Sequence, residues 1–293
     1  MQRDDVDILL ITYRRPIYAR MSIERLLGQA DARTRVWLWH NGDDAETLAL
    51  AQSYARHPRV HRCHHSPENQ RLVGPTRWLW ENAEGAYVSK VDDDCLLDDD
   101  WIVRLRAAHA AEPRFGVIGA WRFQDEDYRP DLAERKLRTF GGGTRLLVNT
   151  WVQGSGYLMK RECFERVGHL SPERADFSRY CMDVAEAGWI NGFVFPFVRE
   201  DHMDDPRSPG SLLKSDADIA DHVPLGVQKD GVKTIADWLE RVRWNAYMVQ
   251  SAPTDVRWLH GWRLRLRMLS HAARRAAGLT KDPGPNPKFR RGA

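Results

Sequence analysis

The sequence contains little cysteine. No two of its four cysteines have the CxxC spacing of a structural zinc site, and four thiols scattered over 293 residues do not form the disulfide framework of a small secreted domain. We interpret them all as reduced thiols: Cys63, Cys95, Cys163 and Cys181.

A long apolar run is also missing. The apolar run at residues 6–12 is short and follows Asp4 and Asp5, which is not typical of a secretory signal. No segment approaches the roughly 20 apolar residues of a membrane span. The pattern therefore predicts a cytoplasmic protein.

Charge of one sign is not in large excess. The 44 Lys and Arg residues against 41 Asp and Glu give a net charge of +3, which is too small to predict a nucleic-acid partner. With 42% hydrophobic residues the chain can bury a full core, as one large domain or as a domain with an appendage.

Alternating strand and helix signals fill the first third of the sequence. Short apolar runs at 7–12, 36–39, 60–63 and 86–91 predict strands, and the stretches at 17–27, 45–56 and 76–83 predict helices. This alternation predicts an α/β fold with a mainly parallel, doubly wound sheet and helices on both faces. We place a catalytic domain at 1–212, a basic helical extension at 213–280 and a disordered tail at 281–293.

Three consecutive carboxylates, Asp92, Asp93 and Asp94, end the fourth predicted strand. Such a cluster repels itself unless cations compensate it, and ligands bind at strand ends in open α/β sheets. Oxygen ligands suit a hard divalent ion, Mg²⁺ or Mn²⁺. The alternative is an acidic turn exposed to water.

An ordered set of motifs resembles the family-2-type glycosyltransferases with the GT-A fold, over roughly the first two hundred residues. The motifs are the first-strand loop 12–16, the second-strand turn 40–43, the carboxylates 92–94 and the glycine-bearing segment 154–161 with the turn 167–170. The resemblance implies metal-dependent, inverting transfer of a sugar from a nucleotide-diphosphate donor to a hydroxyl of a glycan or lipid-linked acceptor. The usual role of this family suggests that the protein acts in bacterial surface polysaccharide synthesis.

The resemblance also implies roles for individual residues. Asp94 and Asp92 would bind the metal, with His202 completing the site, unless His202 is an ordinary surface histidine. Gly154, Ser155 and Gly156 would lie on the acceptor side. The donor nucleotide-sugar would contact Thr12, Tyr13, Arg15, Asn41, Arg77, Lys90, Asp92 and Asp93.

Several of these donor residues have a structural alternative. Tyr13 is equally compatible with core packing, Arg77 with a solvated helix position, and Lys90 with a strand edge that faces water. The second-strand turn carries His40 where the family usually has an acidic residue, so the sequence leaves the nucleotide base open.

Two aspartates compete for the role of general base that deprotonates the acceptor hydroxyl. Asp176 and Asp183 lie seven residues apart, so a single helix would present both on one face. The alternatives are a helix N-cap for Asp176 and a solvated helix position for Asp183.

The segment 256–277 lacks acidic residues and alternates arginine with large apolar residues. On a helix, Leu259, Trp262, Leu266, Leu269 and Ala273 form one apolar stripe. Such a helix either lies on an anionic membrane near a lipid-linked acceptor or packs its stripe on the catalytic domain.

Two other functions compete with sugar transfer. A nucleotidyltransferase on a similar fold would usually begin with a glycine-rich phosphate loop, which residues 12–16 lack. A non-enzymatic nucleic-acid binder would use the arginine/tryptophan segment and keep the acidic cluster as a calcium or structural site.

Overall fold

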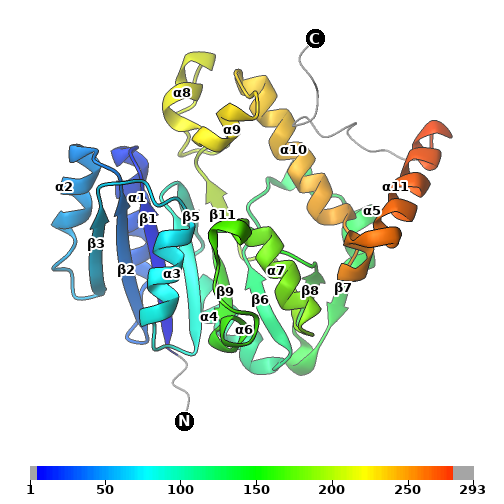
Figure 1. Cartoon of the computed structure of the whole chain (residues 1–293), viewed down its shortest axis with the longest axis horizontal. Coiled ribbons are helices and arrows are strands. Elements are labelled where there is room, and N and C mark those ends of the chain that lie inside the picture. The colour runs from blue at the N-terminus through cyan, green and yellow to red at the C-terminus, as the bar shows by residue number, and fades with distance from the viewer. Residues whose placement is uncertain (1–4, 280–293) are drawn as a thin grey trace.

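A large mixed sheet forms the centre of the protein. The computed structural model describes residues 5–279, and within this range nine strands pair in the order β3-β2-β1-β4-β9-β6-β10-β8-β7 (Figure 1). The strands are β1 (Val6–Thr12), β2 (Thr34–Asn41), β3 (Val60–Ser66), β4 (Tyr87–Asp92), β6 (Phe115–Gly119), β7 (Leu137–Thr139), β8 (Arg145–Val148), β9 (Tyr157–Lys160) and β10 (Ile190–Phe195).

The predicted parallel core is confirmed, with antiparallel insertions that the sequence did not indicate. β3, β2, β1 and β4 are mutually parallel, as are β6 and β10, whereas β9 runs antiparallel between β4 and β6. In the register, Thr12 pairs with His40 and Ile11 with Asp92. The carboxyl ends of β1, β2 and β4 therefore meet at one edge of the sheet.

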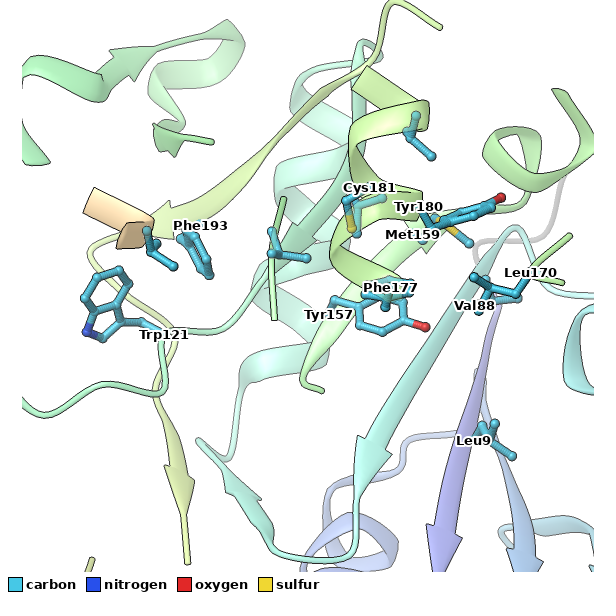
Figure 2. Packing of buried hydrophobic residues seen from close by; sticks show 14 of the residues in the cluster. Leu9, Val88, Trp121, Tyr157, Met159, Leu170, Phe177, Tyr180, Cys181 and Phe193 are labelled. Carbon is cyan, nitrogen blue, oxygen red and sulfur yellow. The ribbon is translucent and has the colours of Figure 1, made fainter. Parts of the chain in front are cut away.

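Helices cover both faces of this sheet, as predicted. Successive residues of β1 point to opposite faces, so Leu9 belongs to one buried cluster while Ile8 and Leu10 belong to the other. The first cluster lies under α3 (Val73–Asn82), α6 (Arg161–Val167) and α7 (Phe177–Glu186), and the second under α1 (Pro16–Gln29) and α4 (Trp101–Ala111). Figure 2 shows Phe177 of α7 lying against Tyr157 of β9, with ring centroids 4.3 Å apart.

A second, two-stranded sheet lies beside the carboxyl end of β4. Its strands are β5 (Cys95–Leu97) and β11 (Glu200–His202), which run antiparallel with His202 opposite Cys95. The N–H of Met203 donates to the carbonyl of Asp94 at 2.7 Å. This pairing brings residues 200–204 next to the three carboxylates.

Shorter elements complete the first two hundred residues. They are α2 (Ala45–Ser53), α5 (Pro130–Ala133) and the 3₁₀ turns η1 (Asp125–Asp127), η2 (Glu134–Lys136), η3 (Gly141–Gly143) and η4 (Pro172–Arg174).

The C-terminal extension, residues 213–279, packs partly into the main core. Trp238, Val242, Ala246 and Val249 of α10 (Ile235–Ser251) belong to the same buried cluster as the sheet residues. The Trp238 indole also donates to the carbonyl of Asp204 at 2.6 Å. The other elements of the extension are η5 (Asp216–Asp218), α8 (Ile219–His222), α9 (Leu225–Lys229), η6 (Val256–Leu259) and α11 (Gly261–Ala276).

The last helix, α11, differs from α10 because none of its residues is buried. It projects at the right of Figure 1, away from the sheet. The single predicted stripe is wrong at Leu259, because the chain is extended at His260 and leaves that residue in η6. No helix between residues 5 and 279 has the length and apolar character to cross a membrane. The predicted tail at 281–293 lies outside the described residues.

We predict that Trp238→Ala destabilises the whole protein, because this side chain is 4% exposed and joins α10 to the core. The expected loss is about 3–5 kcal/mol in the free energy of unfolding, measured by urea denaturation. The matched control is Trp262→Ala on α11, where the side chain is 65% exposed. That change should cost less than about 0.5 kcal/mol. Equal midpoints for the two variants would contradict the docking of α10.

Candidate active site

The carboxylates at the end of β4 are largely buried. Asp93 and Asp94 are 4% and 3% exposed, whereas the Asp92 side chain is 38% exposed. Isolated buried charges cost several kcal/mol each, so cations must compensate them. Lys90, itself buried, supplies one through an ion pair with Asp92. The predicted contact between Lys90 and the carboxylates is present, and the strand-edge alternative is not.

Arg15 supplies the second cation. It follows β1 in the left-handed backbone region, with φ 56°, and its guanidinium pairs with Asp93 and, at 2.9 Å, with Asp94 Oδ2. The N–H of Tyr13 donates to Asp93 Oδ2 at 3.0 Å. Burial raises the pKa of Asp93, whereas the charges of Arg15 and His202 overcome burial at Asp94 and hold its pKa well below the usual range. Asp94 is therefore ionised.

His202 faces the same carboxylate from β11. Its Nδ1 pairs with the buried Asp204, which leaves Nε2 to face Asp94 Oδ1 at 3.8 Å. Burial opposes the charge on His202, but Asp204 and Asp94 outweigh it and raise the pKa of His202 to about 9. A carboxylate on the far nitrogen is the arrangement that orients histidine ligands in metal sites.

Asp94, Cys95 and His202 offer ligand atoms that all lie within 4.8 Å of one another. Adjacent ligands of a six-coordinate ion with bonds of about 2.1 Å are separated by about 3 Å, so Asp94 Oδ1 and His202 Nε2, which lie 3.8 Å apart, must approach each other to share one ion. Burial raises the pKa of the Cys95 thiol, and a neutral thiol is a poor ligand for a hard ion. The donor set therefore fits Mn²⁺ or Mg²⁺ on Asp94 and His202, with binding of the ion displacing the proton that the raised pKa of His202 retains at neutral pH. Asp92 does not join this group.

The predicted acceptor segment packs directly against the carboxylates. The Ser155 hydroxyl accepts a hydrogen bond from the Asp92 N–H at 3.1 Å. Gly156 has φ 61°, and a Cβ at this position would overlap the carboxylate of Glu200, so only glycine fits. Gly154 has more room and approaches Phe177 of α7.

The residues at the ends of β1 and β2 are held tightly. Thr12 is buried and shares a hydrogen bond of 3.0 Å with His40 Nδ1. Tyr13 is only partly buried and lies against Gly42, so its ring is not part of the core. The Asn41 amide bonds the Trp39 indole, the Gln70 N–H and the Arg71 carbonyl. Through these contacts Asn41 holds the loop after β3 in place.

Arg77 and the two candidate bases lie on helices. Arg77 is exposed on α3 and pairs with Glu81 at 2.6 Å, which corresponds to the solvated alternative. Asp176 is the exposed N-cap of α7 and accepts the Ser178 N–H at 2.8 Å. Asp183 lies on the same helix and pairs with Arg179 at 3.2 Å. The N-cap alternative for Asp176 is therefore present, whereas the Asp183 side chain is 13% exposed and does not occupy a solvated position. The choice between the two bases rests on their positions.

Three residues near the carboxylates were missed by the sequence interpretation. Asp204 orients His202 and keeps Oδ2 without a partner among the described residues. Glu200 is 3% exposed, and neither oxygen makes a hydrogen bond to a described residue. Arg122 reaches His202 Nε2 at 3.4 Å. The short segment 200–204 carries no periodic pattern, so only the pairing of β5 with β11 reveals Glu200 and Asp204, and Arg122 is recognised only by its contact with His202.

The geometry defines the class of site. A buried carboxylate and a histidine lie side by side at the carboxyl edge of a mixed α/β sheet, flanked by arginine, lysine and a close-packed glycine segment. Such a site suits a divalent cation with a diphosphate ligand.

Comparison with known proteins identifies the family. The model of glycosyl transferase family 2 matches residues 7–173, so the chain belongs to this family and is a glycosyltransferase. A search of curated proteins finds no match.

Two solved structures resemble the chain to different extents. A mannosyltransferase from Pyrobaculum calidifontis, in complex with GDP-Man and Mn²⁺, has a TM-score of 0.56 at 16% identity, covering 96% of this chain and 82% of that one. Residues 1–349 of TarS from S. aureus give 0.49 at 10% identity, covering 85% of this chain and 67% of that one. The first of these structures shows the GT-A fold that the sequence motifs implied.

Proposed function

We propose that the protein is a metal-dependent, inverting glycosyltransferase that uses a nucleotide-diphosphate sugar. The observation that carries this proposal is the pairing of ionised Asp94 with the oriented His202. Mn²⁺ or Mg²⁺ is the proposed cofactor, and the mannosyltransferase with GDP-Man and Mn²⁺ supports the donor class. The family match favours sugar transfer over the nucleotidyltransferase and nucleic-acid alternatives.

The chemistry requires stabilisation of the departing diphosphate. A divalent cation, when bound, supplies a Lewis acid for that group. Asp94 and His202 would hold the cation, and Asp204 would keep the histidine ring in the required orientation. Arg15 and Lys90 neutralise the remaining carboxylates and keep them in place.

Among the two candidate bases, position favours Asp176. It immediately precedes Phe177, which contacts Tyr157 and approaches Gly154 at the edge of the carboxylate cluster. Asp183 lies about two turns further along α7 and is held by Arg179. Asp176 would take the proton of the acceptor hydroxyl while the hydroxyl oxygen forms its bond to the anomeric carbon. The diphosphate leaves with the electron pair of the broken bond.

We predict that Asp94→Ala removes the metal-linked binding of nucleoside diphosphate. With Mn²⁺, saturating GDP or UDP should raise the melting temperature of the unaltered protein, because a ligand at about 100 times its Kd adds about 2.7 kcal/mol. The variant should show no shift that depends on Mn²⁺. Asp99→Ala is the matched control, since its side chain is 84% exposed and pairs only with Arg25 among the described residues. A full Mn²⁺-linked shift in Asp94→Ala would contradict the assignment.

We predict that Asp176→Asn lowers kcat by about 100-fold or more while leaving nucleoside diphosphate affinity unchanged. Asparagine caps helices as well as aspartate, so α7 should remain stable. Asp183→Asn removes the charge that pairs with Arg179, about two turns further along α7, and should retain turnover. The measurement is the rate of nucleoside diphosphate release from the sugar nucleotide that binds. The reverse ranking of the two variants would make Asp183 the base.

We further propose that α11 holds the enzyme on anionic lipid, close to a lipid-linked acceptor, at the inner face of a bacterial membrane. Trp262, Leu266 and Leu269 are 65%, 49% and 67% exposed on one side of α11. Neighbouring helix positions carry Arg263, Arg265, Arg267, Arg274 and Arg275. An exposed apolar stripe beside arginines is typical of interfacial helices. Synthesis of a surface polysaccharide or a lipid-linked oligosaccharide would use this position.

We predict that the double variant Leu266→Glu, Leu269→Glu loses binding to phosphatidylglycerol vesicles. Each leucine inserted into lipid contributes about 1.5–3 kcal/mol, so the partition coefficient should fall at least about tenfold. The control is Val103→Glu, which adds a charge at a 56% exposed apolar position on α4. Co-sedimentation of both variants equal to that of the unaltered protein would exclude membrane binding through α11.

A further inference from the structure

We propose that Arg122 binds a phosphate group beside the cation site, an inference that rests on the proposed function. Arg122 follows β6 in a segment whose backbone is held by the site itself. Ala120 donates to the Gly156 carbonyl at 2.8 Å, and Trp121 exchanges hydrogen bonds with Val198 and Glu200. Figure 2 shows the Trp121 indole beside Phe193 in the core. The guanidinium therefore extends from a rigid base.

Arg122 differs from the other arginines around the site in lacking a carboxylate partner. Arg15 pairs with Asp93 and Asp94, Arg199 with Asp125, and Arg207 with Asp127 and Asp205. The partly buried Arg122 guanidinium forms no ion pair with a carboxylate of the described residues. Burial raises the pKa of the Glu200 carboxyl, and the charge of Arg122 acts against this rise. Its polar side-chain contact is the long one to His202 Nε2, at 3.4 Å.

The unused donors indicate the chemistry of the ligand. A guanidinium has five N–H donors in a planar fork, and the histidine can accept at most one of them. Phosphate oxygens match this fork and form charge-assisted hydrogen bonds. His202, the proposed ligand of the cation, lies on the same side, so an anion here would be bound between Arg122 and the cation site.

The space beside Arg122 is about 10 Å³ and holds about one water molecule, so binding of a phosphate group requires the lining side chains to move apart. Arg122 and His202 line a small cleft with Phe123, Asp205, Trp238 and Val242, so one wall comes from α10 of the extension. Asp205 is the carboxylate of this cleft, and its charge is neutralised by Arg207 at 2.7 Å. The phosphate would come from the donor diphosphate or from a phosphorylated acceptor.

Isothermal titration of Arg122→Ala, Arg122→Lys and Arg145→Ala tests the proposal. Arg145→Ala removes the same charge from the exposed first residue of β8, where the guanidinium lies over Phe195. The probes are GDP and UDP, each with Mn²⁺, and then inorganic phosphate added to protein saturated with the nucleotide that binds. Arg122→Lys keeps the positive charge but lacks the planar set of guanidinium N–H donors. If Arg122→Ala does not fold, the lysine variant still tests whether Arg122 binds phosphate.

If Arg122 binds the donor, both Arg122 variants should lose about tenfold or more in nucleoside diphosphate affinity, with the larger loss in alanine. If it binds an acceptor phosphate, nucleotide affinity stays unchanged and inorganic phosphate binding falls by a similar factor. Affinities for both probes equal to those of Arg145→Ala would overturn the proposal. Failure of the unaltered protein to bind either nucleotide would instead refute the proposed donor, and inorganic phosphate alone would then decide the role of Arg122.

Discussion

The compensation of buried negative charge at the end of β4 is the constraint on which the rest of the site depends. Asp93 and Asp94 are almost inaccessible to water, and an unpaired charge in that position would favour unfolding by several kcal/mol. Arg15, Lys90 and His202 each approach one of the carboxylates. Asp204 Oδ2 and both oxygens of Glu200 lack a hydrogen-bond partner among the described residues, and burial raises the pKa of both carboxyls.

The fold produces this cluster by bringing together segments that are distant in sequence. Parallel pairing aligns the ends of β1, β2 and β4, which places Arg15 beside Asp93 and Asp94. The β5–β11 pairing adds His202, and Gly156 permits the close approach of Glu200 from the same small sheet. Because α10 shares the core and bonds the Asp204 carbonyl through Trp238, the extension also supports the site.

Local sequence signals predicted the strands of the parallel core and the edge of the sheet where the site lies. Apolar runs marked β1, β2 and β4, and the three aspartates marked the ligand edge, because strand ends in such sheets collect polar residues. The family motifs added His202, whose place beside Asp94 is fixed by strand pairing and not by spacing.

Other features depend on contacts that no local pattern encodes. Asn41 bonds two backbone groups of the loop after β3 and the Trp39 indole of β2, and Arg77 pairs with Glu81 on the exposed side of α3. The local sequence at these two positions does not distinguish a ligand contact from a structural one. Arg122, Glu200 and Asp204 gain their surroundings only when β11 pairs with β5. The extended backbone at His260, which separates Leu259 from α11, likewise has no strong breaker besides Gly261.

The central claim is that Asp94 and His202 bind one divalent cation between them. Anomalous diffraction from crystals soaked with Mn²⁺ and a nucleoside diphosphate tests it most directly. The account predicts one strong manganese peak within about 2.0–2.4 Å of Asp94 Oδ1 and His202 Nε2. A manganese peak elsewhere in the molecule, or none at this pair while the nucleotide is bound, would contradict it.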